Sequence, residues 1–256
     1  LGICSSGSPS LVLNQQGDWI NPAEGTAWTL DGNAGTDPNV NFLGTTDSSP
    51  LVFRFNSQIS GYLSDNNIFF GSSVFDPLTT TAVGITSIGV FTGGGGTGSD
   101  ESTYVGYQAG GGADNCPRSV FIGTQAGFDN NDAADSVFIG YQACGDGATH
   151  RVFQSVLIGA SSHTVTDNSN ICAVGYDADA SGNNSTAIGS QTIVHNQNSI
   201  ALGYGATSSN DFEFAIPDDV TNIKWRGVSY MLPDTLPSVN SFLKCDSLGK
   251  LTWEPI

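Results

Sequence analysis

A five-residue pattern of serine, three apolar residues and glycine recurs through the middle of the chain, and it restricts the possible folds more than any other feature. Its clear copies are SVFIG at 119–123 and 136–140, SVLIG at 155–159, STAIG at 185–189 and SIALG at 199–203, with ICAVG at 171–175 as a variant without the serine. The closing glycines stand at positions 106, 123, 140, 159, 175, 189 and 203, so the steps between them are 17, 17, 19, 16, 14 and 14. This period is too short for a repeat of helical hairpins and matches one coil of a β-solenoid.

Within each copy, alternate side chains of an extended strand face opposite sides. The residues one and three before each glycine therefore share a face, and nearly all of them are apolar. We expect these two rows to fill the inside of each coil. They are Val105, Ile122, Ile139, Ile158, Val174, Ile188 and Leu202, and Thr103, Val120, Val137, Val156, Cys172, Thr186 and Ile200.

The opposite face is apolar as well, although in a lone solenoid it would meet water. It carries the residues two before each glycine, Tyr104, Phe121, Phe138, Leu157, Ala173, Ala187 and Ala201. We expect this row to form the interface of a homotrimer, because closed association of identical chains buries it most economically. The substitution Phe138→Asp should then prevent assembly, and the change from Phe to Ala along the row indicates chains that lie closer together at the Ala end. The small residues three after each glycine mark a second tight corner: Ala109, Ala126, Ala143, Ser162, Ala178, Thr192 and Ala206.

The two ends of the chain lack the repeat. The apolar runs and turn residues in 1–66 predict an N-terminal β segment, with a hairpin at 11–13 and 18–20 and a strand at 51–55. Residues 67–208 hold the repeats. Residues 209–256 predict a small β cap or adaptor, with a hairpin whose arms, 242–245 and 250–253, flank a loop with a glycine.

The formal net charge is −17, from 24 acidic and 7 basic residues. This excess of acidic residues argues against nucleic-acid binding and against docking on anionic lipid. We interpret the acidic side chains as a solvated surface that keeps the particle soluble. No stretch is long and apolar enough to cross a membrane, and no direct membrane insertion is expected. The chain opens at Leu1 without a signal peptide, which indicates a processed or excised product.

No residue pattern points to catalysis, a cofactor or a metal. The five cysteines form no CxxC pair, and an odd, scattered set fits thiols buried as small hydrophobic groups in a chain made in a reducing compartment. This favours a virion fibre over an exported adhesin. The histidines His150, His163 and His195 are expected to be solvated. Residues 129–135 superficially resemble a calcium loop, but Ala133 stands where a third oxygen ligand belongs and no glutamate closes the loop. Each tryptophan is assigned to core or interface packing.

Two groups of segments resemble known proteins. Residues 184–189 and 198–206 (NSTAIG and NSIALGYGA) resemble the head repeat of YadA-like trimeric adhesins, and residues 136–143 (SVFIGYQA) are similar to the repeat of bacterial, phage and large-virus fibre proteins. Residues 28–36, 41–47 and 50–54 also look like a segment that precedes such repeats. The resemblance implies a left-handed parallel β-roll that forms a homotrimer for attachment to surfaces, and it supplies no ligand.

The sequence therefore predicts an all-β chain, a parallel β-solenoid assembled as an intertwined or side-by-side homotrimer, with small β end domains. The expected function is a trimeric fibre or adhesin head, extracellular-facing on a virion, phage or bacterial surface, that attaches to a receptor of a host or target cell, possibly a glycan. Two alternatives stay open: a purely structural shaft or spacer, and a carbohydrate-active enzyme of the tailspike type.

Overall fold

The structure, a computed structural model, describes residues 12–13, 19–20, 34–37, 39, 41–72, 81–93, 98–145, 151–165, 167–225, 228–233 and 241–256. Within these ranges the secondary structure consists of strands and turns, without a helix. The chain forms two compact units, Leu1–Leu51 and Val52–Ile256. The expected all-β class is confirmed.

In the first unit, β1 (Val12–Leu13) pairs antiparallel with β2 (Trp19–Ile20), with Val12 opposite Ile20 and Leu13 opposite Trp19. This pairing confirms the hairpin predicted from residues 11–13 and 18–20.

The main sheet begins with two antiparallel steps. The strand expected at 51–55 is β3 (Leu51–Phe55), which a two-residue turn joins to β4 (Gln58–Leu63). Both turn residues, Asn56 and Ser57, have positive φ angles, of 47° and 63°, the conformation that a tight hairpin turn requires. Strand β5 (Ile68–Phe70) then pairs antiparallel with β4.

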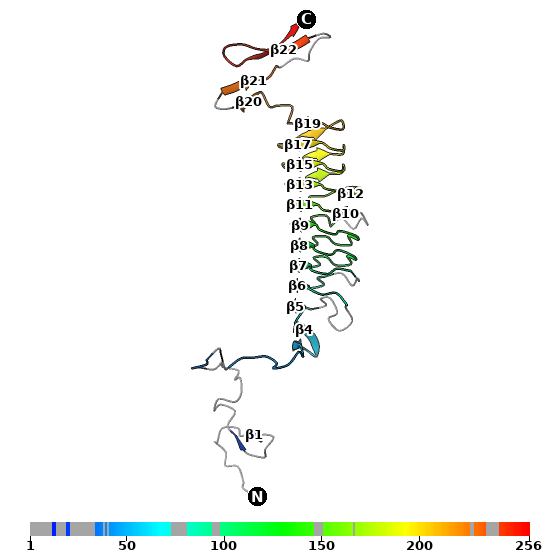
Figure 1. Ribbon diagram of the computed structural model, residues 1–256, viewed down its shortest axis with the longest axis vertical. Coiled ribbons are helices and arrows are strands. Elements are labelled where there is room, and N and C mark those ends of the chain that lie inside the picture. Colours follow the sequence, from blue (N-terminus) through cyan, green and yellow to red (C-terminus); the bar gives the residue numbers. More distant parts are fainter. Residues whose placement is uncertain are drawn as a thin grey trace. The chain divides into compact units, whose positions relative to one another are not determined.

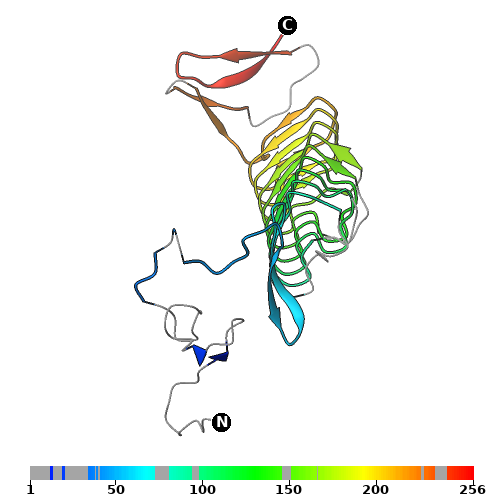
Figure 2. The ribbon, with the colours of Figure 1, turned by 60° about the horizontal axis from the view of Figure 1, so that its bottom comes forward.

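From β5 onward the chain winds into a solenoid, and its strands stack in parallel on one side (Figure 1). Each added strand is one coil further along the chain, and the view of Figure 2 shows the coils following one another as a regular stack. The register runs without a slip, so that equivalent residues of the repeat lie side by side. After β5 the strands are β6 (Thr86–Ile88), β7 (Thr103–Val105), β8 (Val120–Ile122), β9 (Val137–Ile139), β11 (Val156–Ile158), β13 (Cys172–Val174), β15 (Thr186–Ile188), β17 (Ile200–Leu202) and β19 (Phe214–Ala215). The predicted β-solenoid is confirmed.

Two further sides of the coil carry shorter parallel ladders, one that precedes strands of the main sheet and one that follows them. One joins β10 (Val152–Phe153) to β12 (Asn168–Ser169), and the other joins β14 (Asp179–Ala180), β16 (Ile193–Val194) and β18 (Thr207–Ser208). The chain reaches the ladder of β14, β16 and β18 by turning a corner directly after the main-sheet strand, at the small residues predicted to mark a tight corner. All seven of those residues are buried.

The repeat glycine is required because two coils meet there. Gly106 has a φ of +133°, and a Cβ atom built on it would lie 2.6 Å from the carbonyl oxygen of Gly123 in the next coil. Only glycine combines this backbone conformation with so close an approach. The glycine that closes each copy of the pattern therefore fixes the corner of a coil.

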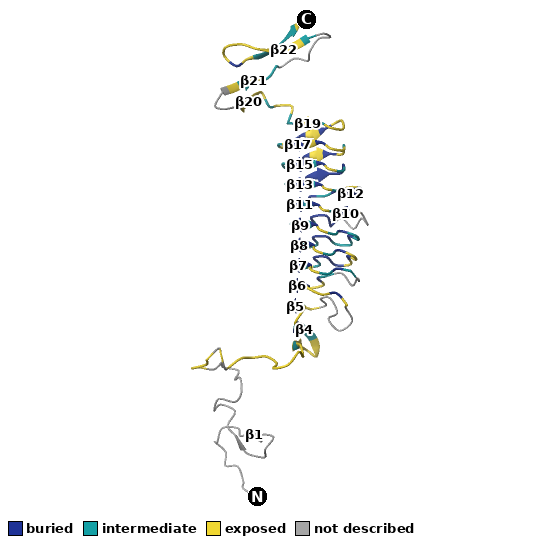
Figure 3. Ribbon diagram, viewed as in Figure 1, coloured by how far each residue is buried: buried dark blue, intermediate teal, exposed yellow. Residues whose placement is uncertain are grey.

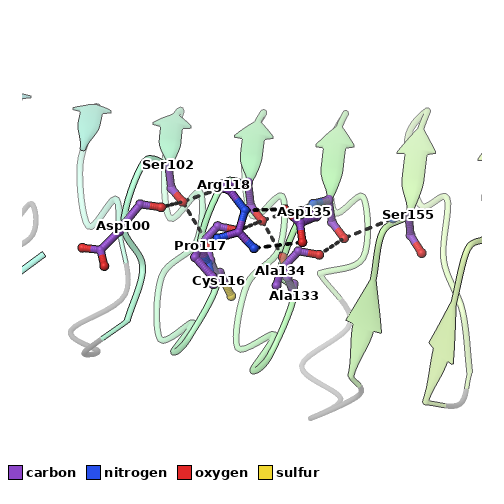
Figure 4. Close-up of polar contacts among 11 residues, drawn as sticks. Asp100, Ser102, Cys116, Pro117, Arg118, Ala133, Ala134, Asp135 and Ser155 are labelled. Atoms are coloured by element: carbon purple, nitrogen blue, oxygen red, sulfur yellow. Dashed lines mark hydrogen bonds and ion pairs between the residues drawn. The ribbon is translucent and has the colours of Figure 1, made fainter. Parts of the chain in front are cut away.

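At the opposite corner, before each strand, the hydroxyl of the repeat serine forms hydrogen bonds with backbone N–H and carbonyl groups (Figure 4). The buried hydroxyl of Ser136 donates to the carbonyl oxygen of Val152 at 3.0 Å and accepts the N–H of Ser155, in the next coil, at 3.3 Å. Ser102 repeats the arrangement, donating to Cys116 at 2.7 Å and accepting the N–H of Ser119 at 3.2 Å. Since buried backbone groups must be paired, the serine holds one coil on the next.

The C-terminal part contains two hairpins. Strand β20 (Asn222–Trp225) pairs antiparallel with β21 (Val228–Met231), and β22 (Ser241–Cys245) pairs with β23 (Leu251–Pro255). The second pair confirms the hairpin predicted from 242–245 and 250–253, with Gly249 at a φ of +85° in its loop. The division into segments 1–66, 67–208 and 209–256 stays a prediction, and the main ladder includes β19, beyond residue 208.

Candidate functional site

The row expected at a trimer interface lies inside the coil. Tyr104, Phe121, Phe138, Leu157, Ala173, Ala187 and Ala201 each expose 0% of their surface in a single chain. Figure 3 colours the ribbon by burial, and buried, half-buried and exposed segments all occur in the stack of coils. The rows one and three before each glycine, expected inside, are half-buried or exposed instead. The predicted orientation of the strands is therefore wrong. A side chain without surface in one chain cannot contact another chain, so these seven residues are core residues.

The physical reason is the width of the coil. Each repeat strand of the main sheet has three residues between turns, and only its middle side chain reaches the interior. The rings of Phe121 and Phe138 stack inside at 4.7 Å with an interplanar angle of 6°, and Tyr104 meets Phe121 edge-on at 5.4 Å. The stacking distance is close to the spacing of neighbouring strands, about 4.8 Å. The longer coils hold such rings, whereas the shorter coils toward the C-terminal end hold alanine. The change from Phe to Ala follows the narrowing of the coil and says nothing about the distance between chains.

Because the middle row fills the core, the residues one and three before each glycine lie on the side of the main sheet that faces away from the core. We call this surface the outer face. Its large exposed residues in the strands from β5 to β17 are between 37% and 46% exposed in one chain: Ile68, Phe70, Ile88, Ile122, Ile158, Ile188, Ile200 and Leu202. From β5 to β19, every outward position of these strands is occupied by Val, Ile, Leu, Phe, Thr or Cys, and none carries a charge. In a chain of net charge −17 this is a continuous neutral, apolar strip.

A second surface runs beside the outer face, at the corner that follows each glycine. The residue directly after the glycine is an exposed tyrosine on every second coil: Tyr107, Tyr141, Tyr176 and Tyr204. We call these four residues the tyrosine row. The sequence contains a signal for this row, since Gly-Tyr recurs at 106–107, 140–141, 175–176 and 203–204, but the signal lies outside the strand pattern from which the interface was predicted.

Glutamines two residues after the repeat glycine form a ladder of side-chain amides on three successive coils. The Nε2 atom of Gln125 donates to Oε1 of Gln108 at 3.0 Å, and Nε2 of Gln142 donates to Oε1 of Gln125 at 3.1 Å. The corner also carries backbone bonds, because the N–H of Ser161 donates to the carbonyl oxygen of Tyr141 at 2.8 Å. These bonds hold the corner at a fixed spacing from coil to coil.

Two histidines meet one buried carboxylate beside this corner. Nε2 of His195 lies 2.7 Å from Oδ2 of Asp179, and Nε2 of His163 lies 3.7 Å from the same oxygen. The side chain of His195 is 56% exposed, as expected for a solvated histidine, whereas that of His163 is only 27% exposed. The sequence did not predict their shared partner, and His150 lies outside the described residues. A hollow of about 430 Å³ opens next to them, lined by Gln142, Ser161, His163, Val165 and Asp177.

Two carboxylates of the segment 129–135 form ion pairs with arginines. Nη2 of Arg118 donates to Oδ2 of Asp135 at 2.9 Å, and the guanidinium lowers the pKa of that carboxyl (Figure 4). Nε of Arg151 lies 3.1 Å from Oδ2 of Asp132. Across the described ranges, no group of three or more His, Cys, Asp or Glu side chains is placed to hold a metal ion. The same part of the chain contains no helix that is long and apolar enough to cross a membrane.

The cysteines follow the expected pattern in part. Cys116 and Cys144 are buried, Cys172 is half-buried, and Cys4 lies outside the described residues. Burial raises the pKa of the Cys116 thiol to about 12, so this thiol stays protonated at neutral pH. Cys245 is exposed, which corrects the expectation of buried thiols for that residue.

Comparison of the chain with models of known protein families, with curated proteins and with solved structures finds no match.

Proposed function

We propose that the chain forms part of a homotrimeric fibre or adhesin head that attaches to the surface of a host or target cell, without catalysis of its own. The observation that carries the proposal is the outer face: a continuous apolar strip, free of charge in the strands from β5 to β19, that one chain leaves exposed to water. Its eight large residues from β5 to β17 are each about 40% exposed. Full burial of such a side chain is worth about 1.5–3 kcal/mol, so covering the strip contributes about 5–10 kcal/mol per chain.

Identical chains are the partners that fit this strip. It is built from strands about 4.8 Å apart, so ten strands give a straight surface about 45 Å long. Another copy of the same strip matches its length and its periodicity. The absence of charge in these strands lets strongly acidic chains approach one another there without repulsion between facing carboxylates.

That the proposed assembly contains three chains rests on the resemblance of residues 184–189 and 198–206 to the head repeats of YadA-like trimeric adhesins. A threefold axis along the stack keeps all chains in the same direction and closes the assembly. The left-handed winding of the coil and the location on a virion, phage or bacterial surface are part of the same proposal.

The mass of the native particle tests the assembly, and a glycan array tests the attachment. The purified, assembled protein is labelled and applied to an array with neutral, sialylated and sulfated glycans. Reproducible binding supports a receptor-binding head. An assembly of the expected mass that leaves the array blank favours the alternative of a structural shaft or spacer. Shortening of any of these glycans during incubation would support the carbohydrate-active enzyme instead.

A further inference from the structure

The tyrosine row and the hollow beside it form a surface that neither fills the core nor belongs to the outer face. Tyr107, Tyr141, Tyr176 and Tyr204 are 48%, 53%, 59% and 72% exposed. A tyrosine side chain combines a large apolar ring with a hydroxyl at its tip, so it can both pack against a ligand and form a hydrogen bond with it. Tyr107 packs edge-on against Phe91 at 6.2 Å, but each of the four side chains leaves about half of its surface or more available to a ligand at this corner.

The spacing of these rings is regular. They occur on alternate coils, and at about 4.8 Å per coil the equivalent backbone positions lie about 9.6 Å apart. The corner is held rigidly, since the carbonyl oxygens of Tyr141 and Tyr176 accept the N–H groups of Ser161 and Gln191 at 2.8 Å. A ligand that uses several rings must repeat along its length with the same period. The length of two pyranose units in an extended β-linked chain is close to this period.

The hollow supplies the polar half of such a site. Tyr141 directly precedes Gln142, and Tyr176 directly precedes Asp177, and both of these polar residues line the hollow. Ser161 and His163 line it as well, with Val165 as an apolar residue. An amide, a hydroxyl, an imidazole and a carboxylate donate to and accept from sugar hydroxyls, whereas the faces of sugar rings pack on aromatic rings.

The charge of the site selects the kind of glycan. Among the described residues, no lysine or arginine lines the hollow, and Asp177 and the nearby Asp179 place negative charge there, in a chain of net charge −17. Sialylated or sulfated sugars would be repelled. We propose that the tyrosine row and the hollow bind a neutral, extended β-1,4-linked glycan that runs along the stack of coils. The inference rests on the proposed attachment function and names the class of ligand for it.

The experiment is calorimetric titration of the assembled protein with neutral hexasaccharides of β-1,4-linked glucose, mannose or N-acetylglucosamine, and with a sialylated oligosaccharide as the anionic probe. We expect binding of at least one neutral hexasaccharide, much weaker binding of its disaccharide, and none of the anionic probe. Tyr141→Ala and Tyr176→Ala should each weaken binding by about five-fold, the loss expected for one stacked ring. Tyr141→Phe keeps the ring and should retain most of the affinity.

Ser190→Ala is the matched control, because Ser190 occupies the same corner on an intervening coil and carries no ring. It should bind like the unmodified protein. As a second measurement without a substitution, hydroxyl-radical labelling of Tyr141 and Tyr176 should fall when the hexasaccharide is bound.

Several results would overturn the inference: no binding of any neutral hexasaccharide, equal binding by the Ala variants, preference for the anionic probe, or labelling of both tyrosines unchanged by a bound glycan. Loss of assembly in Tyr141→Ala, measured by mass, would also overturn it, because the row would then be a contact between chains. The attachment function itself would stand if the assembled protein still bound another receptor on an array or on cells. The attachment function would fail separately if the assembled protein bound no receptor on the array or on cells.

Discussion

Replacement of Phe138 by alanine separates a core role from an interface role most sharply. The ring is fully buried within one chain and stacks on Phe121 at 4.7 Å. Loss of a fully buried phenylalanine side chain costs about 3–5 kcal/mol. Because a solenoid is stabilised mainly by contacts between neighbouring coils, the loss should fall on the coils next to residue 138.

Native-state hydrogen exchange measures this loss coil by coil. The amides of Val137 and Gly140 donate to Ser155 and Ile122 of the adjacent coils, both at 2.8 Å. A local loss of about 3–5 kcal/mol accelerates their exchange by about 10² to 10⁴-fold, since about 1.4 kcal/mol corresponds to a factor of ten. Exchange at Thr186, several coils away, should change far less. The control is Phe138→Leu, which introduces the residue found at this position in the next coil and should cost less than about 1.5 kcal/mol.

A core position for Phe138 would be refuted if Phe138→Ala left local exchange unchanged and released folded single chains. The ring would then lie between chains, as the sequence pattern first indicated. Equal acceleration of exchange in every coil would refute the local character of the solenoid's stability.

Three further predictions concern the backbone corners and the thiols. Gly106→Ala should destabilise the protein by at least about 1–3 kcal/mol, because its φ of +133° is strained for alanine and the next coil leaves no room for a methyl group; thermal unfolding measures this. Ser136→Ala should cost about 1–3 kcal/mol in denaturant unfolding, since it leaves a buried N–H and a buried carbonyl group without this partner. At pH 8, iodoacetamide should modify the exposed Cys245 quickly and the buried Cys116 only after unfolding, as read by mass spectrometry. The pKa of Cys116 is raised, so its contribution to stability is complete below the pKa of an unfolded thiol, near 9, and is lost as the pH rises from there toward 12.

Each of these predictions has a clear contrary result. A Gly106→Ala variant that is as stable as the unmodified chain would contradict the close approach of the coils. If Ser136→Ala left the free energy of unfolding unchanged, the hydroxyl would not be needed to pair the backbone. Ser136→Thr is the control, because threonine keeps the hydroxyl oxygen. Rapid modification of Cys116 in the folded protein would contradict its burial.

The sequence predicted the solenoid because glycine and serine recur in phase, and each performs a task that no other residue performs as well. The serine hydroxyl bridges two coils, and the glycine permits the contact between them. The orientation of the strands could not be obtained in the same way. Alternation defines two faces but does not say which is inside, and both faces of this sheet are apolar.

The missed surfaces depend on the corners rather than on the strands. His163 and His195 are far apart in the sequence and stand at different positions of the repeat, yet the winding of the coil brings both to Asp179. Such a meeting depends on the lengths of individual turns, which differ from coil to coil. The tyrosine row could have been identified, since Gly-Tyr recurs on alternate coils.

The mass of the purified particle in solution, measured by sedimentation or native mass spectrometry, tests the account most directly. The exposed apolar strip predicts that identical chains associate, and the resemblance to trimeric adhesin repeats predicts a particle with three times the mass of one chain. The double variant Ile122→Asp and Ile158→Asp, on the outer face, should give smaller particles whose coils remain folded. A stable, well-dispersed single chain in the unmodified protein would contradict the account.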